Sequence, residues 1–301
     1  MELQQLRYFV AVAETGNFTR ASERCHVAQP SLSQQIINLE KELGHKLFHR
    51  LGRKAVPTEA GLAFLARSRR ILLEVDDTFR ELKDSSSFER SITIGAIPTL
   101  APSLIPPLIA LAAKRLPQLS IQVHEDFHDK LVEDVGGGVL DLAILAVPVR
   151  DPSLSVETVF SEPLLVVVGK KHALASKSRI SVDDIKKERF VMMGSGSTLA
   201  QEIHRFCGEN DFQPAIVATC AQVATVKTLV AAGFGISILP QGVITWEDRA
   251  SLISHSLSGR SPTREIAVAR HPLRYQTKGA ELFLGILREH TKKAPARITS
   301  R

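Results

Sequence analysis

The first 58 residues constrain the fold most strongly, because three short helical patterns follow one another and a compact basic segment succeeds them. The first pattern repeats apolar residues at helical spacing and ends at Gly16. The second begins at Asn17, a residue type that favours the N-cap position. The third has Pro30 in its first turn, where the missing N–H is not needed, and ends at Gly44. These lengths predict a compact unit of three helices.

The basic segment after the third helix is predicted to form a two-stranded hairpin. Between Lys46 and Thr58 it contains four Lys or Arg residues and no acidic residue, and short apolar pieces flank a turn at Gly52. A cationic hairpin beside three helices favours an anionic partner.

The outer face of the third helix is small and polar, and it lies opposite the inner positions Leu32 and Ile36. Gln29 and Ser33 are four residues apart on this outer face. A Gln side chain can pair with adenine in the major groove, and Ser adapts to several base edges. The hairpin would then contact backbone phosphates or an adjacent minor groove. We therefore predict DNA contacts at Thr19, Arg20, Gln29, Pro30, Ser31, Ser33, Gln34, Arg50, Arg53 and Lys54.

The alternative interpretation is that the polar face is only solvated and that the hairpin charges only increase solubility, because a run of charge is often just surface. Each feature taken alone leaves this alternative open. The order of the elements, three helices and then a basic hairpin, favours DNA binding.

A long helix is predicted to begin after Thr58, its cap, and to continue to about residue 83. Leu65, Leu72 and Phe79 recur seven residues apart along it. A heptad-like stripe on a helix outside any core implies a partner helix, which a second copy of the chain would supply. Residues 84–88 have the composition of a linker.

From Ser91 onward, strand patterns alternate with helical patterns, which predicts α/β architecture with a parallel sheet covered by helices. We expect two lobes with chain crossings near residues 161–163 and 264–269, and a last helix at about residues 275–290 that packs on the first lobe. The expected strands are residues 92–97, 120–124, 140–147, 164–169, 190–193, 215–219 and 235–239, and the clearest helices are residues 104–115, 130–135, 199–207 and 222–232.

The composition excludes several classes of protein. A chain of 301 residues is long enough for two or more domains. No apolar run reaches the ~20 residues of a membrane span and no signal-peptide pattern opens the chain, so we expect a cytoplasmic protein with no membrane partner. Three widely spaced cysteines do not indicate a disulfide framework or a zinc site. The formal net charge of +6 agrees with an anionic partner.

Several segments of the N-terminal sequence together resemble the LysR-type transcriptional regulators. They are residues 6–21 (LRYFVAVAETGNFTRA), 28–36 (AQPSLSQQI), 39–44 (LEKELG) and 57–61 (PTEAG), with Leu47, Phe48, Arg50 and Arg53 between them. The resemblance implies a winged helix-turn-helix, a dimerising linker helix and a two-lobed regulatory domain similar to periplasmic binding proteins. It also implies that Gln29, Pro30, Ser33 and Gln34 contact DNA and that Arg53 makes the wing contact.

On this basis the fold class is an α/β multidomain protein. We expect a winged helix-turn-helix DNA-binding domain at residues 1–58, a dimerising linker helix with its hinge at residues 59–90, and an effector-binding domain at residues 91–301. Lobe I of that domain would comprise residues 91–162 and 268–301, and lobe II residues 163–267. The expected partners are double-stranded promoter DNA, RNA polymerase, a small-molecule effector and further copies in a homodimer or homotetramer. Such a regulator acts as an activator or a repressor by changing lobe closure and the spacing of its DNA-binding heads.

The effector is expected between the two lobes, at strand ends and helix N-termini. The predicted contacts are Pro98, Thr99, Leu100, His128, Ser195, Gly196, Ser197, Thr198 and Phe234. Helix N-termini favour negative charge, so a small anion such as a carboxylate is the expected ligand. The alternative is that Thr99, Ser197 and Thr198 only cap helices, a position that such residues favour.

The regulatory part resembles the peroxide-sensing, OxyR-like branch of that family, through residues 97–99, 124–125, 206–207 and 230–236. This resemblance implies two redox cysteines nine residues apart. The second coincides with Cys207, but Thr198 stands where the first is expected. A hydroxyl group cannot undergo the oxidation steps of a thiol. The sequence therefore lacks the disulfide pair that this branch uses.

Two regulatory alternatives stay open beside a small-molecule effector. Cys207, Cys220 or the pair Met192 and Met193 would respond to oxidants individually, although buried cysteines more often serve packing. The other alternative is a DNA-binding assembly that needs no effector.

An enzymatic function is not indicated. Ser195 or Ser197 with His128 or His204 would supply a nucleophile and a base, but no third group is placed to orient the histidine. Zinc-binding, Walker A and dinucleotide-binding patterns are absent from the sequence, so we expect no cofactor and no metal.

Overall fold

The computed structural model describes residues 1–52, 54–86, 90–259 and 261–293. The chain divides into two compact units, Met1–Ser86 and Ser87–Arg301. Each unit has its own buried core, and each is described by itself.

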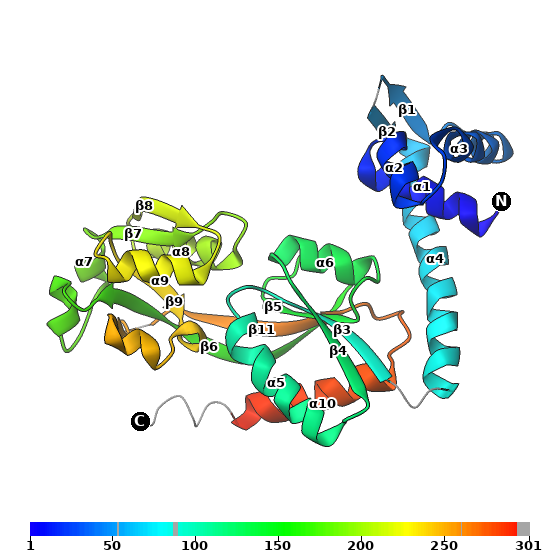
Figure 1. The fold of residues 1–301 in the computed structure, drawn as a ribbon. Coiled ribbons are helices and arrows are strands. Elements are labelled where there is room, and N and C mark those ends of the chain that lie inside the picture. Colours follow the sequence, from blue (N-terminus) through cyan, green and yellow to red (C-terminus); the bar gives the residue numbers. More distant parts are fainter. Residues whose placement is uncertain (53, 87–89, 260, 294–301) are drawn as a thin grey trace. The chain divides into compact units, whose positions relative to one another are not determined.

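The N-terminal unit contains the three helices, the hairpin and the long helix that the sequence predicts (Figure 1). The Asn17 side chain accepts hydrogen bonds from the N–H groups of Thr19 and Arg20, which confirms it as the cap of the second helix. Pro30 lies in the first turn of the third helix, as predicted. The elements are α1 (Leu3–Thr15), α2 (Phe18–Arg24), α3 (Gln29–Leu43), β1 (Phe48–Leu51), β2 (Lys54–Pro57) and α4 (Glu59–Ser86).

Aromatic side chains hold this unit together. The Phe9 ring is fully buried, and its centroid lies 5.2 Å from that of Phe48 on β1 and 5.1 Å from that of Phe64 on α4. The hairpin is also bound through the backbone, because the Ala55 N–H donates to the Gly16 carbonyl at 2.8 Å. The hairpin is therefore fixed against the helices.

Helix α4 is capped as predicted, because the Thr58 hydroxyl accepts from the Gly61 N–H at 3.0 Å. The helix continues through Ser86, so the prediction of a linker from residue 84 was wrong for residues 84–86; residues 87 and 88 lie outside the described part. Its predicted stripe is partly exposed: Phe79 keeps 69% of its accessible surface. The large apolar side chains that α4 leaves exposed are Leu62, Ile71, Phe79 and Leu82.

The C-terminal unit has two lobes with separate hydrophobic cores. In lobe I, α5 and α10 cover one face of the sheet and α6 covers the other (Figure 1). Its principal elements are β3 (Arg90–Ala96), α5 (Ala101–Arg115), β4 (Leu119–Glu125), α6 (His128–Gly136), β5 (Leu142–Ala146) and α10 (Lys278–Lys293).

Lobe II is built around a parallel strand pair, with helices packed beside it. Its elements are the short η1 (Ala173–Ser176) and α7 (Val182–Ile185), then β7 (Arg189–Met193), α8 (Thr198–Glu209), β8 (Ala215–Cys220), α9 (Val223–Ala231), β9 (Ser237–Pro240), η2 (Gln241–Val243), η3 (Glu247–Ala250) and β10 (Leu252–His255). Strands β7 and β8 are parallel. Met192 and Met193 on β7 are buried in this core.

Two long strands, β6 (Ser155–Gly169) and β11 (Thr263–Arg270), run side by side between the lobes (Figure 1). They are antiparallel, and they join β10 and β9 of lobe II to β5, β3 and β4 of lobe I in one seven-stranded sheet. The prediction of a purely parallel sheet was therefore incomplete. The two predicted crossings are continuous strands, because the chain passes between the lobes in extended form. β10 was not predicted.

Gly61 offers a test of how closely α4 meets the hairpin. A Cβ atom at this position would lie 2.2 Å from the Leu47 carbonyl oxygen, a backbone atom. We expect Gly61→Ala to destabilise the N-terminal unit by about 1–3 kcal/mol through overpacking. Thermal unfolding followed by circular dichroism measures the change.

The matched control is Gly285→Ala in α10, where nothing lies within 4 Å of the added methyl group. Alanine favours helix over glycine by up to ~1 kcal/mol, so this variant should be no less stable than the wild type. Equal Tm values for the two variants would contradict the close contact at Gly61.

Candidate DNA-binding surface and ligand cleft

Helix α3 presents the predicted polar face to solvent. Gln29, Pro30, Ser31 and Gln34 are exposed and Ser33 is half-buried, while the opposite face packs in the core. The N-cap residue, Ala28, has no side-chain oxygen to cap the first turn. An uncapped helix end of this kind suits a phosphate group.

The hairpin is coupled to α3 through Arg50. The Arg50 guanidinium donates to the Ser33 hydroxyl at 3.2 Å and lies 4.6 Å from the centroid of the Phe18 ring. Its position is therefore defined by both a hydrogen bond and a cation–π contact. Of the other predicted contacts, Thr19, Arg20 and Lys54 are exposed, and Arg53 lies outside the described residues.

Glu40 was missed by the sequence analysis, although it orients the hairpin. Its carboxylate is 3% exposed and accepts from the N–H groups of Leu47 and Phe48 and from the Lys46 ammonium. Burial raises the pKa of Glu40, but these hydrogen bonds outweigh burial and hold the pKa below its ordinary value. The sequence feature that could have identified Glu40 is an acidic residue next to Leu39, toward the C-terminal end of the buried face of α3.

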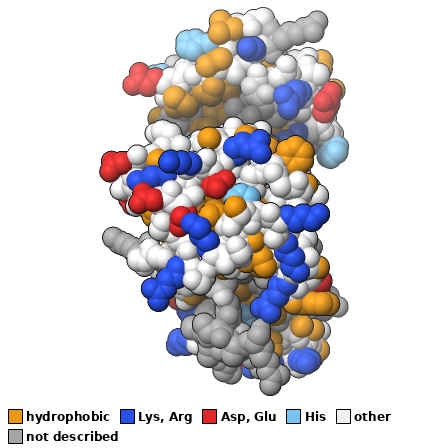
Figure 2. All heavy atoms as spheres, turned by 90° about the vertical axis from the view of Figure 1, so that its left-hand side faces the viewer, with side chains coloured by type: hydrophobic (Ala, Val, Ile, Leu, Met, Phe, Trp, Pro, Cys, Tyr) orange, Lys and Arg blue, Asp and Glu red, His pale blue; other side chains and the backbone are white. Residues whose placement is uncertain are grey.

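The charge on the C-terminal unit differs from that of the hairpin. Figure 2 views the structure from the left-hand side of Figure 1, where lobe II lies, and basic and acidic side chains are interspersed there. Basic groups away from acidic ones favour phosphate binding. Arg50 and Lys54 of the hairpin make no ion pair with the described residues, whereas Lys46 pairs with Glu40. The charge pattern therefore favours the N-terminal unit as the DNA-binding part.

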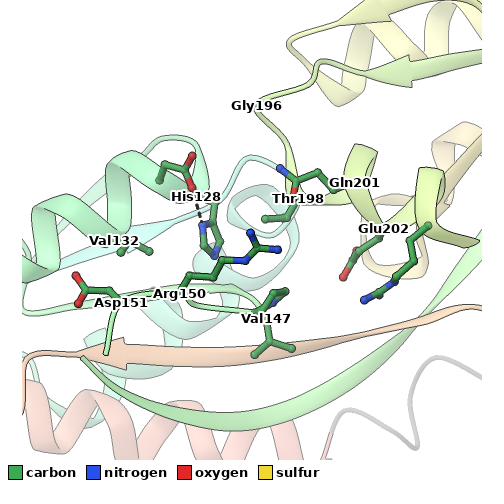
Figure 3. A pocket seen from close by; sticks show the side chains of 12 residues that line it. His128, Val132, Val147, Arg150, Asp151, Gly196, Thr198, Gln201 and Glu202 are labelled. Atoms are coloured by element: carbon green, nitrogen blue, oxygen red, sulfur yellow. Dashed lines mark hydrogen bonds and ion pairs between the residues drawn. The ribbon is translucent and has the colours of Figure 1, made fainter. Parts of the chain in front are cut away.

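A cavity of about 550 Å³ lies between the two lobes of the C-terminal unit. Figure 3 shows it from close by, with side chains of α6, of the loop after β5 and of α8 around it. The lining residues are His128, Asp129, Val132, Val147, Pro148, Arg150, Asp151, Gly196, Thr198, Gln201, Glu202 and Arg205. The volume and the mixture of polar and apolar walls are those of a small-molecule site.

A narrower recess continues from this cavity. It is lined by Thr99, His128, Ser197 and Thr198 together with four apolar or aromatic neighbours, and its volume of about 10 Å³ fits a group no larger than one water molecule. The structure thus brings together residues that the sequence predicted from three separate segments. Ser197 occupies the N-cap position of α8, but its hydroxyl makes no capping hydrogen bond.

The other predicted contacts lie elsewhere. Leu100 is 2% exposed in the core of lobe I, and Pro98 lines only the narrow recess. Gly196 lines the large cavity, whereas Ser195 and Phe234 line neither and are exposed.

Two buried polar atoms in the cleft have no partner within the described part of the chain. They are Nε2 of His128 and Oε2 of Glu202. Leaving such an atom unsatisfied costs about 1–3 kcal/mol. An unsatisfied buried group in a folded protein indicates a missing ligand, ion or water.

Glu202, on the inner face of α8, is the second residue that the sequence analysis missed. Burial raises its pKa from 4.5 to about 7, with Arg264 and Arg205 opposing the shift and Glu162 adding to it. The sequence feature that could have identified Glu202 is its charge on the apolar side of a helix, between Leu199 and Ile203.

Arg264 and Glu162 form a buried ion pair where β6 and β11 run between the lobes. The guanidinium is 1% exposed, and its Nε donates to Glu162 Oε1 at 2.7 Å. It also donates to the Thr99 hydroxyl at 2.8 Å and to the Thr99 carbonyl at 3.3 Å. The other carboxylate oxygen of Glu162 accepts from the Gly242 N–H of lobe II. This network joins the wall of the cleft to both lobes.

Comparisons with known proteins identify the family of both parts of the chain. Residues 3–62 match the family described as "Bacterial regulatory helix-turn-helix protein, lysR family", and residues 85–292 match "LysR substrate binding domain". The chain belongs to the LysR family of transcription regulators. As a LysR-type regulator it has a DNA-binding helix-turn-helix domain and an effector-binding domain.

Curated relatives of this regulator include a "Hydrogen peroxide-inducible genes activator" of Pectobacterium carotovorum subsp. carotovorum, 31% identical over 293 residues (96% of this chain, 97% of the relative). The "DNA-binding transcriptional dual regulator OxyR" of Escherichia coli (strain K12) is 33% identical over 242 residues (80% and 79%). Among solved structures, that of a full-length OxyR variant from Pseudomonas aeruginosa has a TM-score of 0.71 and 27% identity, covering 96% of this chain and 98% of that one. The resemblance to the OxyR-like branch is therefore confirmed.

The cysteines of this LysR-type regulator are not arranged for easy oxidation. Cys207 is fully buried on the inner face of α8, and burial raises its pKa to about 11. Cys220 ends β8 and is half-buried. At neutral pH the Cys207 thiol stays protonated, and a protonated thiol is a poor nucleophile toward peroxide.

Other features add no further chemistry. His204 is exposed on α8 and lines neither cavity. Among the residues that the structure describes, no group of three or more His, Cys, Asp or Glu side chains is placed to hold a metal ion. Within the same residues, no helix has both the length and the apolar character to cross a membrane.

The raised pKa of Glu202 predicts a specific pH dependence of stability. The folded chain holds the proton of Glu202 more tightly than the unfolded chain does. The stability that this proton adds to the folded state is therefore fully present below pH 4.5 and is lost as the pH rises toward about 7. Gln cannot ionise, so Glu202→Gln should be more stable than the wild type at pH 8, by up to about 3 kcal/mol, and similar to it at pH 4.5.

Thermal unfolding of the C-terminal unit across this pH range measures the difference. Glu209→Gln, at an exposed site on the same helix, is the matched control for removing one carboxylate. A stability difference for Glu202→Gln that stays constant with pH would show that this carboxyl is not buried as described.

Proposed function

We propose that this LysR-type regulator binds promoter DNA through α3 and the hairpin, and that a small-molecule effector bound between lobes I and II controls its action on transcription. The observation that carries the proposal is the cavity of about 550 Å³ lined by unpartnered polar groups, in a chain whose other unit is a helix-turn-helix. We assign DNA binding to residues 1–58, dimerisation to residues 59–90 and effector sensing to residues 91–301. Its place of action is the cytoplasm, where promoter DNA and RNA polymerase are found.

Effector binding would act through the strands between the lobes. The chain passes between the lobes along β6 and β11, which pair over residues 155–163 and 263–270, so a change in lobe closure would bend these two strands. A ligand shifts this equilibrium by as much as its affinity for the two closures differs. Altered spacing between paired DNA-binding heads then changes DNA bending and the access of RNA polymerase.

Assembly into dimers and tetramers is supported by α4. Its exposed Phe79 and Leu82 are 69% and 64% accessible, which is unusual for large apolar side chains on a helix of a single chain. A second copy of α4 would cover them, as the heptad-like spacing predicts. Two such dimers would form the homotetramer.

The DNA-reading role predicts separate effects for base and phosphate contacts. We expect Gln29→Ala to reduce the preference for the target sequence over a variant site by about 5- to 100-fold, the worth of one good base contact. Lys54→Gln should instead weaken binding to all duplexes alike and lower the salt dependence of affinity. Fluorescence anisotropy with target and random duplexes at several salt concentrations measures both.

Retention of full sequence discrimination by Gln29→Ala would show that α3 is not the reading helix at this position. Gln118→Ala is the matched control, because this exposed glutamine lies just before β4, in the C-terminal unit.

A second candidate function is response to peroxide, which the names of the OxyR relatives favour. In this chain the equivalent chemistry would rest on Cys207, which is buried and protonated, on Cys220, which is half-buried, or on Met192 and Met193, which are buried in the core of lobe II. The small-molecule effector is therefore the better supported of the two.

We expect Cys207→Ser to leave promoter binding and its response to hydrogen peroxide unchanged. The physical reason is that a buried thiol with a raised pKa offers almost no thiolate at neutral pH. Footprinting of the full-length protein before and after peroxide treatment tests this. A peroxide-dependent footprint that Cys207→Ser abolishes would favour the redox function instead.

A further inference from the structure

The ligand cleft contains hydrogen-bond acceptors that have no donor. Oε2 of Glu202 is one of them. His128 Nδ1 lies 3.2 Å from a carboxylate oxygen of Asp129, so a neutral ring that donates from Nδ1 presents a lone pair at the unpartnered Nε2. The side chain of His128 is 8% exposed, and Glu202 is 9% exposed. Both groups therefore need a donor that enters the cavity, either a ligand or an ordered water molecule.

The same cleft contains donors that have no acceptor. Arg150 lines the cavity, is exposed to solvent, and makes no hydrogen bond or ion pair with the residues that the structure describes. Figure 3 shows its guanidinium directed into the space between His128 and Glu202. The first turn of α8, at Thr198, adds the positive end of a 12-residue helix whose N-cap side chain does not bond to it.

The charges around the cavity are close to balanced. Arg150 and Arg205 supply two cations, and Asp129, Asp151 and Glu202 supply up to three carboxylates. A ligand with only negative charge would satisfy the donors, but it would leave the buried acceptors unpartnered and would bring carboxylates together. A ligand with only positive charge would be repelled by Arg150 and Arg205. A ligand that carries both charges fits every group.

We propose that the cleft binds an α-amino acid or a closely related amino carboxylate, whose ammonium group donates to Glu202 and whose carboxylate accepts from Arg150. The inference rests on the proposed function of the cleft as the effector site, and it replaces the simple carboxylate that the sequence suggested. Selectivity comes from Glu202, because a carboxylate without an amine leaves this group unsatisfied.

The groups that face Glu202 determine how the binding of a charged ligand in the cleft changes with pH. Arg264 on β11 and Arg205 on α8 favour its ionised form, Glu162 on β6 opposes it, and burial brings its pKa to about 7. His128 and Asp129 face the same cavity from α6, and Arg150 and Asp151 face it from the loop after β5. An ammonium ligand prefers ionised Glu202, so its binding strengthens from pH 6 to pH 8. A carboxylate paired with protonated Glu202 would show the opposite trend.

The test is isothermal titration calorimetry of the full-length protein with the twenty common L-amino acids, each compared with the acid that lacks the amine and with the amino acid amide. L-Leucine, 4-methylpentanoate and L-leucinamide form one such set. We expect at least one amino acid to bind about tenfold or more tightly than both of its analogues, and to bind more tightly at pH 8 than at pH 6.

Two variants separate the two contacts. Glu202→Gln should remove most of the preference for the amino acid over the acid without the amine, and Arg150→Gln should remove the preference over the amide. Glu133→Gln is the control, because this residue lies on α6, has a 58% exposed side chain and does not line the cavity. It should bind as the wild type does.

Equal or tighter binding of the acids without an amine, or tighter binding at pH 6, would overturn the amino acid proposal while leaving the cleft as an effector site. Failure of every compound to bind would also overturn it. Promoter binding is measured without any of these ligands, so the proposed DNA-binding function stands or fails separately.

Discussion

The regulatory domain depends on Arg264, the most buried charged side chain among the residues of this domain that the structure describes. A guanidinium with 1% exposure has lost its hydration, which costs several kcal/mol unless ion pairs and hydrogen bonds replace the water. Glu162 and Thr99 supply that replacement, and the Gly242 N–H holds the same carboxylate from lobe II. Removing one partner of such a pair typically costs about 3–5 kcal/mol. The crossing between the lobes is therefore a stiff junction, and movement of the lobes must bend the strands around it.

This junction also explains why the cleft beside it depends on a ligand. Arg264 is occupied by Glu162 and Thr99, so it lowers the pKa of nearby Glu202 without donating a hydrogen bond to it. Glu202 and His128 are left buried without partners on opposite sides of the cavity. A ligand that bonds to both sides favours the lobe arrangement in which both contacts form. Binding energy is thereby converted into a preference for one lobe closure.

The DNA-binding unit is constructed differently, because most polar groups on the outer face of α3 are exposed. The Phe9 ring and the Glu40 carboxylate fix the hairpin, and Arg50 of the hairpin bonds to Ser33 on α3. Exposed Gln and Ser side chains on a rigid helix are free to bond to base edges. Sequence reading therefore depends on the helix geometry, whereas affinity depends on the basic hairpin and on salt.

Local patterns predicted most of this arrangement. Asn17, Pro30 and Thr58 were identified from capping chemistry, and most strands of both lobes, though not β10, from short apolar segments. β6 was predicted only in its lobe II half and β11 only as a crossing, because β6 packs on both cores and its pattern changes along the strand. Thr99, His128 and Thr198 were found because they follow strands or begin helices. Glu40, Glu202 and Arg264 were missed because a charge at an inward position does not reveal its surroundings in the fold. Glu40 bonds to the hairpin, Arg264 bonds to Thr99 and Glu162, and Glu202 faces the cavity.

The most direct test of ligand-controlled lobe closure is a crystal structure of the full-length protein, purified from the cells that produce it without added ligand. We predict electron density for a small molecule between the lobes, with one polar end at Glu202 and the other at Arg150. A cleft in which Glu202 and His128 are bonded only to ordered water, in the presence of an intact and specific promoter complex, would contradict it.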